Sequence, residues 1–225
     1  MTTRVALVHA VAVAIDPVRE AFAELWPEAE LANILDDSLS PDRARDVELS
    51  PALAERIASL GRYALSSGAD AVLYTCSAFG PAIEAFAAST PRPVLTPNEA
   101  MFARALTAGR RLGMLATFAP SVASMEAEFR AQAAEAGVDA DLATVLVEPA
   151  MVALKAGDAA AHNRLLAGAA SALAGRDAIM LAHFSTSCAL QAVSAVATCP
   201  VAVSSSATPA IADNSSFRLI PKPPA

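Results

Sequence analysis

The amino-acid sequence predicts an α/β protein built of two similar lobes, each a parallel sheet flanked by helices. One observation is an internal repeat at an offset of 107 residues, which aligns residues 70–77 with 177–184 and residues 4–8 with 111–115. A second is the alternation of short apolar runs with helical segments, which is typical of parallel strands joined by crossover helices. A third is the hydrophobic fraction of 55%, which supplies the core that such lobes require.

The repeat divides the chain near its middle. It predicts a first lobe over residues 1–106, a second lobe over residues 107–212 and a tail over residues 213–225. Because the tail contains Pro221, Pro223 and Pro224, we expect it to be extended, and it carries no identifiable chemistry. The offset also makes Cys76 the counterpart of His183, so the two lobes are expected to form a site where these side chains meet.

The elements of the first lobe follow from local signals. Apolar runs with β-branched residues predict buried strands. Asp16 and Pro17 are typical of a helix start, with aspartate as N-cap, and Gly68 is typical of a helix end. We expect a strand at 5–9, a helix at 16–26, a strand at 31–35, a polar loop at 36–41 and a helix at 51–67. After these come a strand at 71–75, a turn at 76–80, a helix at 81–88, a strand at 93–96 and a helix at 98–107.

The second lobe restarts the same pattern. We expect a strand at 112–116, a loop through Pro120, a helix at 121–136, a strand at 143–147, a helix at 159–174 and a strand at 178–182. Ligands of parallel sheets bind beyond the carboxyl ends of the strands. Cys76, Ser77, Thr117 and His183 all fall at such ends, which makes them candidates for a functional site.

Charge and composition exclude several function classes. Lys and Arg total 16 against 23 Asp and Glu, a net charge of −7 without a basic run, so no nucleic-acid binding is expected. The same charge repels anions, so a carboxylate ligand needs local donors. Residues 178–212 lack charged side chains but are rich in Ser and Thr and interrupted by Pro200 and Pro209, so no membrane span is expected.

Cysteine and histidine spacing points to a protein without metal or disulfides. The three cysteines form no CxxC pair and the three histidines show no metal-ligand spacing. A sparse, odd cysteine count is typical of a reducing compartment, so a cytoplasmic protein is expected. No GxGxxG or P-loop motif supports nucleotide binding. A homo-oligomer is compatible with the sequence.

Three residues stand out for chemistry. Cys76 lies between a strand and a helix start, where backbone N–H groups and the helix dipole lower a thiol pKa and can bind a carboxylate or its enolate form. The alternative is a small buried cysteine. His183 is a candidate for proton transfer or for a direct Cys–His pair, and the alternative is a structural histidine. The Thr117 hydroxyl either orients a carboxylate or caps a turn.

These residues resemble the aspartate/glutamate/hydantoin racemase superfamily, which includes arylmalonate decarboxylases and maleate isomerases. The resemblance covers nearly the whole chain. It rests on the motif at residues 70–80, on residues 111–117 and on the second-half motif that ends at His183. It implies two pseudo-symmetric lobes around a central cleft that holds the active site, a small carboxylate substrate and no cofactor.

The resemblance also implies roles for single residues. Racemases of the superfamily use one cysteine per lobe: one thiolate removes the α-proton of the substrate and the other thiol returns a proton from the opposite face. Cys76 matches the first-lobe cysteine, whereas His183 stands at the second-lobe position; decarboxylases of the superfamily keep only the second-lobe cysteine. Cys76 and His183 are therefore the candidate catalytic residues. The residues expected to bind substrate are His9, Thr75, Ser77, Asn98, Thr117, Phe184 and Ser185.

Three mechanisms remain open, and we take the first as the leading expectation. In the first, Cys76 and His183 are unlike acid–base partners in racemisation, epimerisation or isomerisation. In the second, Cys76 alone protonates or attacks, which gives decarboxylation or a maleate-isomerase-like covalent addition. In the third, the lobes bind a small carboxylate without turnover.

Overall fold

The computed structural model describes residues 2–45 and 48–204, and in it the chain forms two compact units. The division falls between Pro97 and Asn98, whereas the repeat placed the boundary after residue 106. Helix α5 (Glu99–Ala108) is the reason, because its buried side chains pack in the core of the second unit. The expected tail at 213–225 and the end of the second lobe at 205–212 lie outside the described residues.

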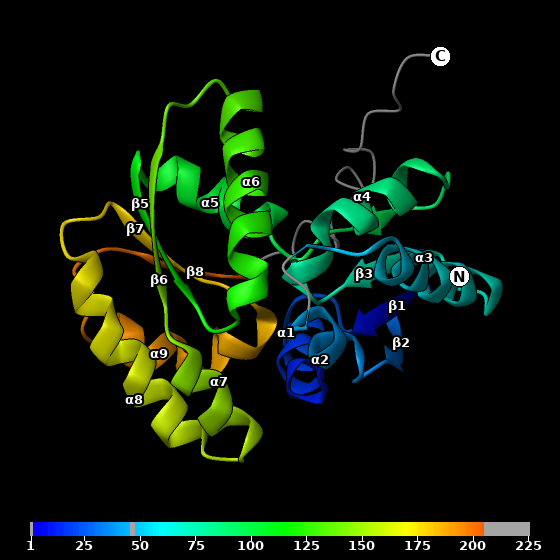
Figure 1. Ribbon diagram of the computed structural model, residues 1–225, viewed down its shortest axis with the longest axis horizontal. Helices are drawn as coiled ribbons and strands as arrows, with labels where there is room; N and C mark the ends of the chain where they lie inside the picture. The colour runs from blue at the N-terminus through cyan, green and yellow to red at the C-terminus, as the bar shows by residue number, and fades with distance from the viewer. Residues whose placement is uncertain (1, 46–47, 205–225) are drawn as a thin grey trace. The chain divides into compact units, whose positions relative to one another are not determined.

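The first unit is a four-stranded parallel sheet in the order β2-β1-β3-β4. Its strands are β1 (Arg4–His9), β2 (Glu30–Leu35), β3 (Ala71–Tyr74) and β4 (Val94–Leu95). Its helices are α1 (Ile15–Leu25), α2 (Leu39–Arg43), α3 (Pro51–Ser66) and α4 (Gly80–Ala88), with short 3-10 helices η1 (Ala12–Ala14) and η2 (Ser77–Phe79). Strands and helices are labelled in Figure 1.

The second unit is again a four-stranded parallel sheet, in the order β6-β5-β7-β8. Its strands are β5 (Arg111–Ala116), β6 (Asp141–Leu146), β7 (Ala178–Leu181) and β8 (Val201–Val203). Besides α5, its helices are α6 (Ala119–Glu135), α7 (Glu148–Lys155), α8 (Ala159–Ala169) and α9 (Leu190–Ser194), with 3-10 helices η3 (Ala170–Leu173) and η4 (Phe184–Ala189). The predicted α/β fold with two parallel sheets is therefore confirmed.

The sequence repeat is visible in the backbone. The bounds of β1 and β3 become those of β5 and β7 when the offset of 107 residues is applied. Gly68 and Gly175, which precede β3 and β7, have φ angles of 90° and 78°, a region that glycine enters without steric cost. The aspartate two residues after each glycine makes the same hydrogen bond in both units. Asp70 accepts the Arg4 N–H at 2.9 Å, and Asp177 accepts the Arg111 N–H at 2.8 Å.

Both faces of the second sheet are covered by helices, as parallel sheets require. Neighbouring residues of β5 point to opposite faces: Met114 packs in a cluster with α5 and α6, and Leu115 packs in a cluster with α7, α8 and α9 (Figure 1). In the first cluster Phe102 and Phe129 meet edge to face, with ring centroids 5.5 Å apart. The helices on the two faces hold β5 in place, and with it Thr117, which follows the carboxyl end of this strand.

In the first unit, helix α3 approaches β3 and α4 closely. Tyr74 of β3 donates its phenolic hydrogen bond to the carbonyl oxygen of Ile57 in α3, at 2.8 Å. The Tyr74 ring also meets Phe86 of α4 edge to face at 6.3 Å. Gly61 of α3 lies against both rings, so this helix is seated by aromatic packing on the strand that leads to Cys76.

Three helices depart from the expectation. Helix α1 begins at Ile15 with Ala14 as N-cap, so Asp16 lies in its first turn, where its charge suits the helix dipole. Helix α2 occupies the second half of the expected polar loop at 36–41. Helix α7 falls where no helix was expected. Helices as short as α2 and α7 show too few turns for a hydrophobic period to be recognised. Among the residues described, no helix has the length and hydrophobicity needed to cross a membrane.

Candidate functional site

In each sheet the strand order reverses at one point. The chain passes from β1 to β2 on one side and returns to β3 on the other, and β5, β6 and β7 repeat this arrangement. Ligands of open α/β sheets bind at such reversals, beyond the carboxyl ends of the strands. In the first unit this edge carries His9, Thr75 and Cys76, and in the second it carries Thr117 and His183.

Burial favours the protonated thiol form of Cys76. Cys76 lies two residues after the end of β3, is partly exposed and precedes the 3-10 helix η2 with an extended backbone. Burial raises the pKa of its thiol to about 11, although a hydrogen bond from the Ala78 N–H and the charge of Arg43 both act to lower it. The expected lowered pKa is therefore wrong, because loss of water around the sulfur outweighs the nearby donors.

Arg43 is the residue that sequence reasoning missed. It ends helix α2, is only 6% exposed and donates from its Nε to the carbonyl oxygen of Ala78, at 3.4 Å. A carboxylate ligand was expected to need local donors, and no basic side chain stood among the residues expected to bind substrate. Arg43 is 33 positions from Cys76, just beyond the expected polar loop at 36–41, and no signal in the sequence placed it near the thiol.

His9 and Thr75 are brought together beside Cys76. The Nδ1 atom of His9 lies 2.9 Å from the Thr75 hydroxyl, and its Nε2 lies 2.9 Å from the side-chain oxygen of Asn33. Burial lowers the pKa of His9, although its contact with Asn33 acts to raise it. A neutral imidazole thus links β2, β1 and the residue before Cys76. Both ring nitrogens are engaged by protein groups, so the geometry makes His9 a support for Thr75.

His183 adopts a strained backbone. Its φ of 76° makes it the only non-glycine residue with positive φ among residues 2–45 and 48–204, and its ψ is 142°. Such a conformation costs roughly 1–3 kcal/mol and is concentrated at functional sites. The residue follows Ala182 at the end of β7 and precedes η4, which corresponds in the repeat to η2 after Cys76.

Burial favours the neutral form of the His183 imidazole, and one nitrogen of the ring contacts a serine. Burial lowers the pKa of this ring to about 4. Its Nε2 lies 3.4 Å from the Oγ of Ser121 in α6, and that hydroxyl donates to the carbonyl oxygen of Phe118 at 2.7 Å. A hydroxyl that donates to Phe118 presents a lone pair to the ring, which favours the tautomer with its hydrogen on Nε2. The lone pair of the ring is then on Nδ1, which can accept a proton.

Thr117 has an unused hydroxyl. Its side chain follows β5, is 2% exposed, and its Oγ1 makes no hydrogen bond with any residue in the described part of the chain. A buried hydroxyl without a partner is costly, so a ligand atom or a water molecule is the expected partner. The other candidates near the two strand ends, Ser77, Phe184 and Ser185, are buried in the 3-10 helices that follow Cys76 and His183.

Asn98 and the remaining cysteines lie apart from this chemistry. Asn98 is buried at the start of α5, and its amide donates to Glu128 of α6 at 2.6 Å. None of the three cysteines forms a disulfide. Cys199 is partly buried and packs against the core, whereas Cys188 is exposed.

Comparison with known proteins identifies relatives of this architecture. The profile of the Asp/Glu/Hydantoin racemase family matches residues 14–201. A search of curated protein sequences found no significant match.

Solved structures agree with the family profile. A glutamate racemase from Bacillus anthracis is 12% identical with a TM-score of 0.77, over 93% of this chain and 80% of that one. An aspartate racemase from Picrophilus torridus is 15% identical with a TM-score of 0.72, over 95% and 94%. A mutant of arylmalonate decarboxylase is 20% identical with a TM-score of 0.60, over 91% and 89%. At such identities the likeness establishes the fold.

Proposed function

The chain belongs to the Asp/Glu/hydantoin racemase family, and we propose that it is a cofactor-independent isomerase that moves a proton beside the carboxylate of a small substrate. Cys76 and His183 are the proposed acid–base partners. The bond that they would break and re-form is the C–H bond beside the substrate carboxylate.

The observation that carries this proposal is the presence of two unlike groups, a thiol and an imidazole, at equivalent positions of the repeat, each just beyond a buried strand. The Cys76 thiol, with a pKa of about 11, holds its proton at neutral pH, and the His183 imidazole, with a pKa of about 4, lacks one. Proton transfer at carbon requires one group that takes a proton and another that supplies one. The two residues meet this requirement without prior ionisation.

The proposed step balances within this pair. Nδ1 of His183 takes the α-proton, and the C–H electron pair moves into the carboxylate to form an enediolate. The Cys76 S–H then gives its proton to the same carbon from the opposite face, which leaves an imidazolium and a thiolate. The reverse reaction, or exchange with water, restores the starting state.

Two further groups support a negatively charged substrate. The Thr117 hydroxyl is buried without a partner among the described residues and suits a carboxylate oxygen. The charge of Arg43 beside Cys76 favours negative charge in its surroundings, whether on the sulfur or on a bound carboxylate. Local donors of this kind offset the repulsion from a net charge of −7.

Decarboxylation is the second candidate, because a protonated thiol suits it equally. A thiol with a pKa of about 11 can protonate the enediolate left by loss of carbon dioxide, and this step needs no base. In this reaction Cys76 is essential and His183 is not.

Deuterium exchange tests these readings. A panel of small amino, hydroxy and aryl carboxylates is incubated with the protein in heavy water, and α-deuterium is followed by NMR together with carbon dioxide release. We expect exchange without carbon dioxide, and a roughly 100- to 10,000-fold loss in Cys76→Ala and in His183→Asn. Asparagine tolerates positive φ, so the second variant removes the base with little change in strain.

The control is Cys199→Ala, which removes a thiol that packs against the core, and we expect it to keep its exchange rate. The pH profile adds a second criterion: kcat/KM should be flat between about pH 6 and 9, since His183 stays neutral and Cys76 stays protonated across that range. Loss of carbon dioxide without exchange would favour the decarboxylase, and binding without exchange or carbon dioxide would leave only a carboxylate-binding protein.

A further inference from the structure

Helix α2 touches the segments that follow both β1 and β3. It carries two buried polar side chains, Ser40 at 5% and Arg43 at 6% exposure. The Ser40 hydroxyl donates to the carbonyl oxygen of Ala10 at 3.1 Å, just beyond β1. The Arg43 Nε donates to the carbonyl oxygen of Ala78 at 3.4 Å, in the turn that follows Cys76. The position of α2 therefore decides where the Arg43 charge lies relative to the thiol.

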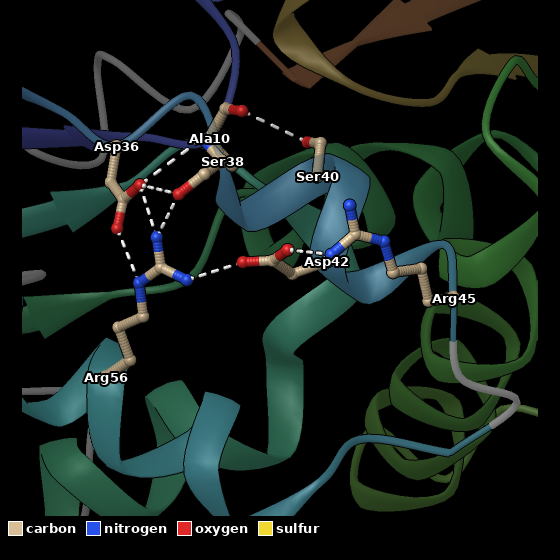
Figure 2. A network of polar contacts seen from close by, with 7 residues as sticks. All are labelled: Ala10, Asp36, Ser38, Ser40, Asp42, Arg45 and Arg56. Atoms are coloured by element: carbon tan, nitrogen blue, oxygen red, sulfur yellow. Dashed lines mark hydrogen bonds and ion pairs between the residues drawn. The ribbon is translucent and has the colours of Figure 1, made fainter.

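A helix of five residues cannot hold this position by itself. Isolated helices shorter than about 12–15 residues are marginal in water, so α2 needs contacts from the rest of the fold. The anchor is Arg56 of α3, whose guanidinium group reaches three side chains around the start of α2 (Figure 2).

The Arg56 contacts form a clasp, which we define as Asp36, Ser38, Asp42 and Arg56. Nε and Nη2 of Arg56 bind the two carboxylate oxygens of Asp36 at 2.7 and 2.6 Å, and Nη1 binds Asp42 at 2.7 Å. Nη2 also contacts the Ser38 hydroxyl. Asp36 follows β2 and Asp42 lies within α2, so one planar guanidinium joins the strand end to the helix (Figure 2).

Asp36 and Arg56 stay charged near neutral pH. Burial alone acts to raise the pKa of Asp36, but hydrogen bonds from Ser38 and Arg56 outweigh it and hold the pKa below its usual value. Contacts with Asp42 and Asp36 raise the pKa of Arg56. These side chains are one-fifth to one-third exposed, so the contacts are partly shielded from water.

We propose that Arg56 is a positioning residue that acts through α2: its clasp on Asp36, Ser38 and Asp42 holds Arg43 beside the turn that carries Cys76. The proposal rests on the proposed function only in taking Cys76 as the reactive group. Ala78 connects Arg43 to Cys76. Its N–H donates a hydrogen bond to the Cys76 sulfur, and its carbonyl oxygen accepts one from Arg43. Without the clasp, α2 and the segment before it lose their ion pairs with α3, and we expect the Arg43 side chain to shift away from the thiol.

The test is the pH profile of Cys76 alkylation by iodoacetamide, followed at the peptide level by mass spectrometry so that Cys188 and Cys199 are counted separately. Only the thiolate reacts, so the rate below the thiol pKa reports the thiolate fraction. We expect Arg43→Gln to slow Cys76 alkylation about three- to tenfold at pH 8, because the nearby positive charge is lost. Arg56→Gln should slow it in the same direction, and Arg43→Gln/Arg56→Gln should be no slower than Arg43→Gln alone.

The proposal is overturned if Arg56→Gln is alkylated at Cys76 as fast as the wild type or faster. It is also overturned if the loss of rate in the double variant equals the product of the losses in the two single variants. The control is Arg62→Gln on the same helix, whose exposed guanidinium binds Glu55 of α3 itself, and we expect no change. Arg56→Lys should restore the rate only in part, since one ammonium cannot reproduce the fork to Asp36 and Asp42. If Arg56→Gln fails to fold by circular dichroism, Asp42→Asn loosens the α2 end of the clasp and carries the same expectation. Alkylation needs no substrate, so the result is independent of whether deuterium exchange is found.

Discussion

Cys76 and His183 occupy one position of the internal repeat but differ in backbone as well as in side chain. The φ of Cys76 is −120°, an extended conformation open to any residue, whereas the φ of His183 is 76°. A histidine there retains a conformation that L-residues avoid, and the burial of its ring leaves it neutral. The strained backbone at His183 lowers the stability of the second unit, and it places an imidazole just beyond the end of β7. Strain of this kind is concentrated at functional sites.

The strain can be measured by comparing two truncations of His183. His183→Gly and His183→Ala remove the same ring, but only glycine enters positive φ without steric cost. We expect His183→Gly to unfold in denaturant with a free energy about 1 kcal/mol higher than His183→Ala. Equal stabilities, or an alanine variant more stable than the glycine variant, would show that the backbone at His183 is not strained.

At the scale of elements, the turn that carries Cys76 depends on how α3 is seated. A Cβ built on Gly61 would lie 2.3 Å from the Tyr74 hydroxyl and 2.2 Å from the Phe86 ring. Tyr74 is the last residue of β3, two positions before Cys76, and is 1% exposed. The absence of a side chain at Gly61 therefore sets the distance between α3 and the strand that leads to the reactive thiol.

Alanine at this position is expected to destabilise the protein although alanine favours helices. Gly61→Ala forces the buried Tyr74 and Phe86 rings to move, and we expect the free energy of unfolding to fall by roughly 1–3 kcal/mol. The matched control is Gly168→Ala in α8, where an added Cβ meets nothing within 4 Å. That change should be neutral or stabilising by up to about 1 kcal/mol. Denaturant unfolding of both variants checks the pair, and similar effects would contradict the close packing of α3.

At the scale of the whole molecule, the two units share one framework. In each, a positive-φ glycine and an aspartate precede the third strand, and the aspartate accepts the N–H of the arginine that begins the first strand. Asp177 also accepts the Arg110 N–H at 2.9 Å and binds the Arg111 side chain at 3.0 Å. These bonds, first among them that from the Arg111 N–H, hold the pKa of Asp177 below its usual value.

A lowered pKa in the folded state has a defined consequence for stability. Ionised Asp177 stabilises the fold at pH values above its unfolded pKa of about 3.9, and this contribution is lost as pH falls through the lower folded pKa. We expect Asp177→Asn to lower Tm at pH 7, and the difference from wild type to shrink below about pH 4. The exposed Asp139→Asn serves as control and should change Tm little at either pH. A Tm difference that does not vary with pH would contradict the role of the ionised carboxylate.

Much of the framework was predictable from local sequence, and the repeat explains why. Strands β1, β3, β5 and β7 fall within one residue of their expected positions, since apolar runs and the glycines before them are local signals. The short helices α2 and α7 were not predicted, because five to eight residues hold too little periodicity. The unit boundary also differs, because α5 is assigned by what its Met101 and Phe102 side chains pack against.

The candidate site was predictable in outline only. The expected positions of Cys76, Thr117 and His183 at strand ends agree with the structure, whereas the contact between His9 and Thr75 emerged only from the fold. The direction of the pKa shift of Cys76 was not predicted. The N–H donor that acts to lower this pKa lies in surroundings that exclude water, and burial raises the pKa by more. Arg43 could not be placed at all, since its approach to Ala78 depends on the clasp formed by Arg56 from another helix.

The order of residues was thus sufficient to establish two parallel-sheet units, their strand ends and the two unlike groups, Cys76 and His183, that stand at equivalent positions. Repeats, caps and apolar runs act over a few residues, so they can be recognised without coordinates. The protonation of those groups, the strain at His183 and the arginine beside Cys76 required the folded chain. Desolvation and electrostatic contact are sums over neighbours that are distant in sequence, and only packing brings those neighbours together.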